Sequence, residues 1–270
     1  MSGTAPAAPA RRWRPPPPIA NPWLRYGLYA GSLIYLTLAI STVEINWHRV
    51  IAGLDRGWQF VGGFLQPDFS ARWPDVVAGM RESLTMTVTA TVAGIALSLP
   101  FGLGAARNLA PRWVYAACRG AIAVSRSLHE VVVAILFVVL VGFGPFAGFL
   151  TITFATVGFL GKLLAEDIED SDSSQLEAIR ATGAGWLQQV NYAVQPQVTP
   201  RLVGLCLYRL DINFRDSAIV GIVGAGGIGA TLNTAIDRYE FDVAAGILIL
   251  IVGIVFLVEL SSSWIRNKVQ

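Results

Sequence analysis

The stretch VVVAILFVVLVGFGPFAGFLTITFATVGFLG, residues 131–161, decides the fold because it contains no charged side chain. As one helix it would run about 46 Å at a rise of about 1.5 Å per residue. The hydrocarbon core of a bilayer is only about 30 Å thick. The central GFGPFAG, residues 142–148, offers glycines and a proline that can turn the chain. We therefore predict two membrane spans here, at about 128–142 and 146–165.

The composition of the whole chain supports a membrane protein. Of the 270 residues, 54% are hydrophobic and only 14% are charged, and the mean hydropathy is +0.55. A soluble domain carries roughly 25% charged residues, so this chain has too few charged side chains to cover its surface in water. It also lacks the G-x-x-x-x-G-K-[ST] motif, so we expect no ATP hydrolysis by a P-loop mechanism in this chain.

Four further apolar stretches bring the expected number of transmembrane helices to six, in an all-α integral membrane fold. We place these spans at about 24–43, 76–104, 198–222 and 243–261. Residues 113–128 carry two arginines on an otherwise apolar stretch, which favours an interfacial helix.

The spans divide the chain into three regions. Residues 1–23, rich in Ala, Pro and Arg, should form a disordered basic tail. Residues 24–75 hold the first transmembrane helix and an outer connection with an amphipathic helix. Residues 76–265 form the core, with a cytoplasmic loop at 166–196.

The basic residues set the orientation. Most of the 20 Lys and Arg side chains fall in segments on the side of the N-terminus, whereas few lie on the opposite side. Cytoplasmic segments are typically enriched in such residues. We therefore expect both termini of a multi-pass membrane protein in the cytoplasm. The residues expected outside are Arg49, Arg56, Arg72 and Arg238.

Cysteine and histidine give no sign of a cofactor. Cys118 and Cys206 sit among apolar neighbours, and His48 and His129 show no metal-ligand spacing. We expect no metal and no cofactor in this chain.

The glycine-rich GIVGAGGIG, residues 221–229, contains a literal G-x-G-x-x-G. That motif binds a dinucleotide only between a strand and a helix of a βαβ unit. Here it lies between two membrane spans, which argues against a membrane oxidoreductase. We predict that Gly224, Gly226, Gly227 and Gly229 permit close packing or a helix break beside a translocation pathway.

The cytoplasmic loop SSQLEAIRATGAGWLQQVNYAVQPQ, residues 173–197, predicts two short helices. Ser174 precedes Glu177 by three residues, a capping box. Gly183 and Gly185 should end the first helix, and a second, at about 186–194, should stop near Pro196. Such a pair of helices could transmit force from a soluble partner to the membrane helices, or it could be a simple connector. The spacing alone leaves both readings open.

The fifth span carries ionisable groups, each of which costs about 2.5–3.5 kcal/mol at a helix centre. Arg209 and Asn213 share a helix face, as do Asp211 and Arg215. Three readings remain open. The Asp211–Arg215 pair could lock the bundle, or Asn213 and Arg215 could line the route of an anionic substrate. Alternatively, the charges, Asp216 included, could lie at the interface, with the span shifted to 216–236.

The cytoplasmic loop resembles the EAA loop of ABC-importer permeases. The resemblance rests on Glu177-Ala178, on Gly183 and on Pro196. In that family the loop docks into a groove on the ATPase subunit, which implies that these four residues couple the chain to an ATPase. The chain departs from the pattern at Ile179, Ala193 and Gln195.

Longer segments are similar to the phosphonate ABC-importer permease family, from about residue 75 to the C-terminus. RSLHE, residues 126–130, is similar to a further family element, but His129 replaces its proline, which predicts a softer helix break. The segments that carry the similarity are GPFAG (144–148), GKLLAEDIE (161–169), ATGAGWLQQVNYAVQPQV (181–198) and YRLDINFRDSAIVGIVGAGGIG (208–229).

The resemblance implies a MetI-like permease core that works as a homodimer with two ATPase subunits. ATP and Mg would bind on those subunits, and an extracytoplasmic binding protein would deliver a phosphonate or related phosphorus oxyanion. The resemblance also implies a place in the bacterial inner membrane, where lipid is a further expected partner. Nucleic acid is not an expected partner. The rival hypothesis is a stand-alone secondary transporter or channel for a small anion, which would need no ATPase.

Overall fold

The computed structural model describes residues 19, 21–43 and 46–269, and all regular structure in these residues is helical. The predicted disordered tail lies almost entirely outside them. The chain divides into two compact units, residues 1–57 and 58–270. The first unit contains α1, Pro22–Ser41. The predicted amphipathic helix is present as α2, Trp47–Phe64, which crosses the boundary between the units.

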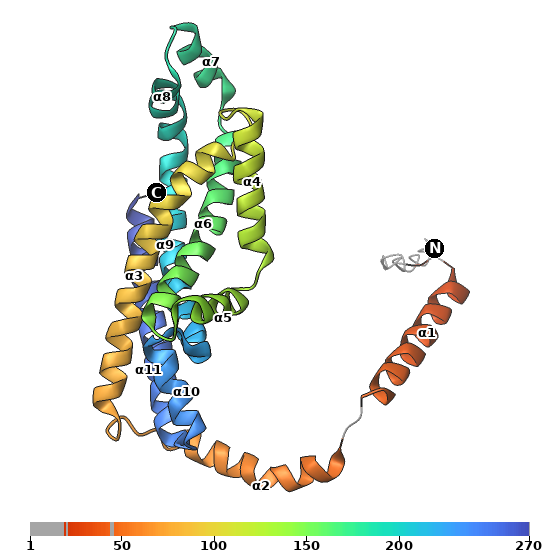
Figure 1. Cartoon of the computed structure of the whole chain (residues 1–270). Coiled ribbons are helices and arrows are strands. Elements are labelled where there is room, and N and C mark those ends of the chain that lie inside the picture. The colour runs from red at the N-terminus through yellow and green to blue at the C-terminus, as the bar shows by residue number, and fades with distance from the viewer. Residues whose placement is uncertain (1–18, 20, 44–45, 270) are drawn as a thin grey trace, which may run out of the picture. The chain divides into compact units, whose positions relative to one another are not determined.

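The second unit is a helical bundle with a short hairpin at one end (Figure 1). Two five-residue π-turns, Val190–Val194 and Gly221–Ala225, interrupt the helices. The helices after α2 are α3 Trp73–Gly104, α4 Arg112–Ser127, α5 Glu130–Val141, α6 Pro145–Glu169, α7 Ser173–Ala181, α8 Trp186–Gln189, α9 Gln195–Val220, α10 Gly227–Asp237 and α11 Phe241–Val269.

Three of the described helices are long and apolar enough to cross a membrane: α3, α6 and residues 241–263 of α11. The number rises to five if each of two bent helix pairs counts as one span. The predicted first span coincides with α1 within two residues at each end. Because α1 is not among these candidates, its crossing of the membrane stays a prediction.

The third span is built differently from the prediction. α5 has 12 residues and is about 18 Å long, too short to cross the bilayer as the separate span placed at 128–142. α4 and α5 are long and apolar enough to cross only when taken together, and the chain bends by 97° between them, as in a broken span or a re-entrant loop. α4 packs along α6, where Ser125 Oγ donates to the Phe154 carbonyl at 2.8 Å, and its interfacial placement stays a prediction.

The bend between α4 and α5 is sharp, so the prediction of a softer break is wrong. His129 is the N-cap of α5, and its Nδ1 accepts a hydrogen bond from the Val131 N–H at 3.3 Å. An N-cap side chain satisfies a backbone donor that the first turn of a helix leaves free. Histidine therefore starts α5 abruptly without the proline that the family element carries.

The helix in the region predicted as the fifth span is also bent. The residues from Trp186 run through α9 to Ala225, and the chain then bends by 57° into α10. The predicted stop near Pro196 is wrong, because Pro196 lies in the first turn of α9. In the preceding π-turn the Gln195 N–H donates to the Val190 carbonyl. Pro196 has no backbone N–H to donate, but the first turn of a helix tolerates proline, so α9 continues past it. The predicted spans 198–222 and 216–236 each cover part of this broken helix.

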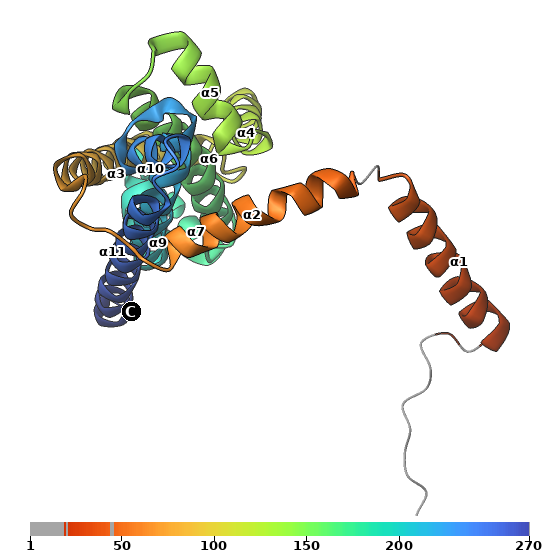
Figure 2. The same cartoon turned by 90° about the horizontal axis from the view of Figure 1, so that it is seen from below.

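The centre of the bundle is the contact between α3 and α6. Gly94 of α3 faces Thr156 of α6 so closely that an added Cβ would lie 2.6 Å from the Thr156 Cβ. Small residues let membrane helices approach in this way. Seen from below, α10 lies beside α3 near the middle of the bundle (Figure 2). The α7–α8 hairpin and α10 thus lie at opposite ends of the second unit (Figure 1).

Candidate functional site

A buried polar network joins α3, α6 and α9. The Asn213 side chain is fully buried, and its amide nitrogen donates to Thr91 Oγ1 at 2.8 Å and to Thr156 Oγ1 at 3.0 Å. Arg209, one turn earlier on α9, donates from Nε to the same Thr156 hydroxyl at 3.2 Å. The shared face predicted for Arg209 and Asn213 is therefore confirmed. Buried polar groups that are paired in this way fix the register of the helices.

Arg209 also forms an ion pair that the sequence reading missed. Its Nη2 lies 2.9 Å from Glu130 Oε1, and only 4% of the Arg209 surface is exposed. The guanidinium carbon lies 5.3 Å from the centre of the Phe159 ring, within the range of a cation–π interaction. Glu130 is the first residue of α5, so this pair ties α5 to α9. The RSLHE segment marks the position of Glu130, but nothing in it reveals the partner.

The predicted Asp211–Arg215 pair forms, with Arg215 Nη2 3.5 Å from Asp211 Oδ2. Asp211 is buried, whereas the Arg215 side chain is 54% exposed. Arg215 thus lies on the surface of the described chain and away from the network around Asn213. The lining of a translocation pathway by Arg215 stays a prediction.

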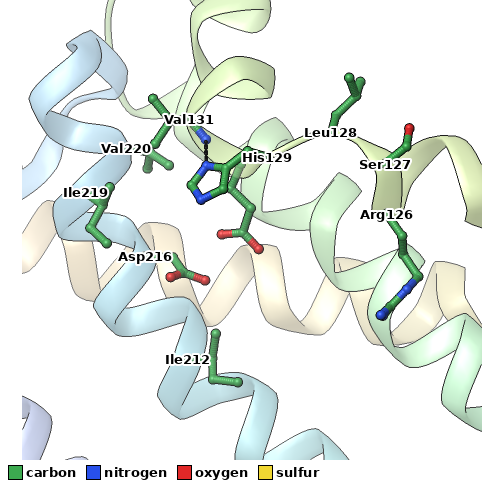
Figure 3. A pocket seen from close by; sticks show the side chains of 10 residues that line it. Arg126, Ser127, Leu128, His129, Val131, Ile212, Asp216, Ile219 and Val220 are labelled. Carbon is green, nitrogen blue, oxygen red and sulfur yellow. Dashed lines mark hydrogen bonds between the residues drawn. The ribbon is translucent and has the colours of Figure 1, made fainter. Parts of the chain in front are cut away.

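A cavity of about 560 Å³ opens beside the network, between the α4–α5 bend and α9. Its lining contains four ionisable side chains, with Arg126 and His129 from the bend, Glu130 at the start of α5 and Asp216 from α9. Figure 3 shows Asp216 on the α9 side of the cavity and His129 on the side of the α4–α5 bend, with Arg126 further along α4. Ionisable groups inside a membrane domain mark functional sites by default.

The predicted glycines form the break between α9 and α10. Gly226 has φ +78°, and a Cβ there would lie 2.8 Å from the backbone nitrogen of Pro145. The Gly144 N–H donates to the Gly224 carbonyl at 3.0 Å, while Gly227 packs on Ser83 and Gly229 on the Ala218 carbonyl. The glycines therefore permit close backbone packing at a helix break.

Glu82 of α3 completes this break and was also missed from sequence. Its carboxylate accepts from the N–H of Gly227, the first residue of α10. Glu82 lines two further cavities. One, of about 590 Å³, also contains Arg81, Thr85 and Thr89, and the other, of about 310 Å³, contains Arg72 and Thr231.

In the cytoplasmic loop the first predicted short helix is present as α7, and the second begins at Trp186 as predicted but does not end near Pro196, because α8 continues through the π-turn into α9. We call Ser173–Gln189 the coupling hairpin. Its N-cap is Asp172 and not the predicted Ser174. Asp172 Oδ1 accepts from the Ser174 N–H at 2.9 Å, and Oδ2 accepts from the Ser174 hydroxyl at 2.9 Å. These two hydrogen bonds hold the pKa of Asp172 below its ordinary value. A carboxylate competes well for this position because it accepts charge-assisted bonds.

The four residues that the resemblance assigns to ATPase coupling lie at the surface. Glu177 and Ala178 are exposed on α7, and Pro196 is exposed at the start of α9. Gly183 has φ +80°, the left-handed geometry predicted for a helix C-terminus. The hairpin also exposes Leu187, at 67%, and Tyr192 of the following π-turn is 70% exposed. Exposed apolar groups of this kind mark contact surfaces.

Comparisons with known proteins agree with these observations. Residues 98–270 match a family described as "Binding-protein-dependent transport system inner membrane component". The phosphite transport system permease protein PtxC of Stutzerimonas stutzeri is 35% identical over 243 residues, which cover 90% of this chain and 86% of that protein. The phosphate-import permease protein PhnE of Mycolicibacterium smegmatis is 42% identical over 203 residues, 75% of this chain. The aligned part spans only 38% of that relative's length.

Solved structures share the fold. A chain of the MetNI methionine ABC transporter, in an inward-facing conformation, superposes with a TM-score of 0.65 at 24% identity, covering 74% of this chain and 99% of that one. A chain of a bacterial alginate ABC transporter gives a TM-score of 0.57 and covers 92% of this chain and 95% of that one. The predicted MetI-like core is confirmed.

Proposed function

The chain belongs to the binding-protein-dependent transport system inner membrane components, in the phosphonate ABC-importer permease family, and from this premise we propose that it is the permease subunit of an importer for a phosphorus oxyanion. A separate subunit would hydrolyse ATP, and alternating access of the permease would move the substrate inward.

The observation that carries this proposal is the coupling hairpin. It projects at one end of the bundle (Figure 1) and exposes Glu177 and Leu187 together with the glycine bend at Gly183. A stand-alone secondary transporter or channel has no use for such a surface. Docking of the hairpin into an ATPase gives it a function, with ATP and Mg bound on that partner.

The proposed substrate is a phosphonate or a related oxyanion such as phosphite or phosphate, in line with the names of the relatives. The permease should offer weak and transient contacts, since conduction requires release as well as binding. The network at Asn213 and the glycine break at Gly224–Gly229 are the proposed pathway elements in this chain. High affinity would come from an extracytoplasmic binding protein.

The proposed assembly is a homodimer of permeases with two ATPase subunits, because one chain offers one coupling hairpin. It would lie in the inner membrane of a bacterium with both termini in the cytoplasm. A cysteine at residue 55 should then react with an impermeant thiol reagent added outside the cells, whereas one at residue 172 should not. The opposite labelling would put the hairpin on the wrong side for any ATPase.

Reconstitution tests the function directly. Proteoliposomes with the permease, its ATPase and its binding protein should take up at least one of phosphite, phosphate, methylphosphonate and aminoethylphosphonate in the presence of ATP. Omission of the ATPase or of ATP should abolish uptake. Uptake driven by an ion gradient without ATPase would instead support the secondary transporter.

A further inference from the structure

The coupling hairpin contacts a part of the bundle to which it is not joined by the chain. Arg180 of α7 donates from Nη2 to the carbonyl of Asn108 at 3.2 Å. The indole N–H of Trp186, the first residue of α8, donates to the carbonyl of Leu109 at 3.2 Å. Both acceptors lie in the turn between α3 and α4, residues 105–110, which we call the α3–α4 turn. The hairpin thus holds two adjacent carbonyls of one turn.

The α3–α4 turn is in turn fixed to α4 and to the end of α6. Arg119 of α4 donates from Nε to the Ala105 carbonyl at 2.9 Å and pairs with Glu169 at 3.0 Å. Glu169 also accepts from the Arg107 N–H at 2.7 Å. The Asn108 amide donates to the Ile168 carbonyl at 3.0 Å. A displacement of this turn must therefore move α3, α4 and the end of α6 together.

The side chains that hold the turn are themselves held. Arg180 Nε donates to Gln189 Oε1 at 3.0 Å, and the Gln189 amide donates to the Ala184 carbonyl at 2.9 Å. Beneath these bonds, Leu109 of the turn and Leu176 of α7 are buried in one apolar cluster. Interiors packed in this way transmit strain because they have low compressibility.

We propose that the α3–α4 turn receives the movement of the coupling hairpin, with Arg180 and Trp186 as positioning residues. The proposal rests on the proposed docking of the hairpin to an ATPase. Through its chain neighbours the hairpin acts on α6 and α9, which continue from its two ends. Through Arg180 and Trp186 it acts on α3 and α4 as well, so that all the helices around the buried network respond to one docking event.

The test measures the number of ATP molecules hydrolysed per substrate molecule imported, in proteoliposomes with the ATPase and binding protein. Arg180→Met removes the donors and keeps the aliphatic length, and Trp186→Phe removes the indole N–H and keeps an aromatic ring. The matched controls are Arg112→Met and Trp113→Phe in α4. Neither control side chain forms a hydrogen bond or an ion pair with the described residues, and Trp113 is 76% exposed.

We expect each test variant to assemble with the ATPase at the yield of the wild type. The number of ATP molecules hydrolysed per substrate molecule should rise by about two- to tenfold, which corresponds to the net free energy of one hydrogen bond. The double variant should exceed either single one, and Arg180→Lys should lie between Arg180→Met and the wild type. The controls should leave the ratio unchanged. An unchanged ratio in the double variant, or a fall in assembly that accounts for the whole loss of transport, would overturn the proposal.

Hydrogen exchange separates this proposal from the identity of the substrate. In the wild-type complex, addition of nucleotide should change the exchange of the amides in residues 105–110. In the double variant that change should be lost, while the exchange of the hairpin amides still responds. This readout needs no transported molecule, so a failure to import phosphorus oxyanions would leave it valid. An equal response of the turn in both complexes would exclude the turn as the receiver.

Discussion

The Glu82 carboxylate accepts a hydrogen bond from the Gly227 N–H at 2.9 Å. The next amide, that of Ile228, donates to Ser83 Oγ at 2.9 Å. Two adjacent side chains of α3 thus satisfy the first two backbone donors of α10, which no residue of α10 itself can reach. The negative charge of Glu82 also matches the positive end of the α10 dipole. α3 therefore positions the helix that follows the break in the fifth span.

Replacement of Glu82 tests this role. Glu82→Ala leaves the Gly227 N–H without its acceptor and should lower stability by about 1 kcal/mol, the usual value of a lost N-cap. Glu82→Gln keeps an oxygen that can accept the bond and should lose less. Thermal unfolding in detergent, followed by uptake in proteoliposomes, measures both. Equal damage by both variants would show that the charge, and not the hydrogen bond, is what α10 requires.

The Arg209–Glu130 pair should be costly to break. Arg209 is almost completely buried, and removal of one partner of a buried pair costs about 3–5 kcal/mol because the other charge is stranded. Arg209→Met should therefore destabilise strongly, and Arg209→Met with Glu130→Gln should destabilise less than the sum of the single changes. Chemical denaturation of the four proteins gives the double-mutant cycle.

Lys162→Met is the control for this cycle. Lys162 pairs with Glu166 at 3.4 Å within α6, and both side chains are more than a third exposed. Pairs of this kind contribute about 0–1 kcal/mol, so the variant should be close to neutral. Simple additivity of Arg209→Met and Glu130→Gln would contradict a direct coupling between α5 and α9.

Local patterns in the sequence predicted most of the helices, and contacts between distant residues account for most of what it missed. The charge-free run predicted a membrane protein, and the glycines predicted the bend of the hairpin and the break near Gly226. The partners of Arg209 and Gly227, which are Glu130 and Glu82, come from helices far away in the sequence, and no periodicity encodes such a pairing. The Asp172 cap was missed because the capping-box spacing pointed to Ser174, although both lie within one turn.

Gly183 provides a test of coupling. Its φ of +80° costs a side chain about 1–2 kcal/mol, but no atom within 4 Å opposes a Cβ there. Gly183→Ala should therefore weaken ATPase association only slightly. Gly183→Trp should prevent docking, because the bend is strained and bulk fills the contact surface, while membrane insertion persists. Co-purification with the ATPase and uptake measure this.

A Gly183→Trp variant that co-purifies at wild-type yield and still transports would reduce the hairpin to a connector. Glu177→Gln supplies an independent probe in the same hairpin. Because Asp172 caps α7, the Glu177 charge is not needed to start the helix. A loss of transport in Glu177→Gln would therefore point to docking.

The break between α9 and α10 should tolerate no bulk at Gly226. A side chain there meets a φ of +78° and the backbone of Pro145 at 2.8 Å, and bulk at a packed contact costs about 1–3 kcal/mol or more. Gly226→Leu should abolish uptake while insertion and ATPase association persist. Gly224→Ala meets a φ of +98° as well, but it adds only one methyl group, whose nearest neighbour is the exposed Phe143 side chain and not backbone, so it should weaken uptake less. Gly120→Leu, in open space on α4, is the control and should transport normally.

A dinucleotide site at these glycines would behave differently. Calorimetric titration would then show micromolar affinity for NAD or FAD, and Gly226→Leu would abolish that affinity. Full uptake by Gly226→Leu would remove the glycine break from the transport pathway.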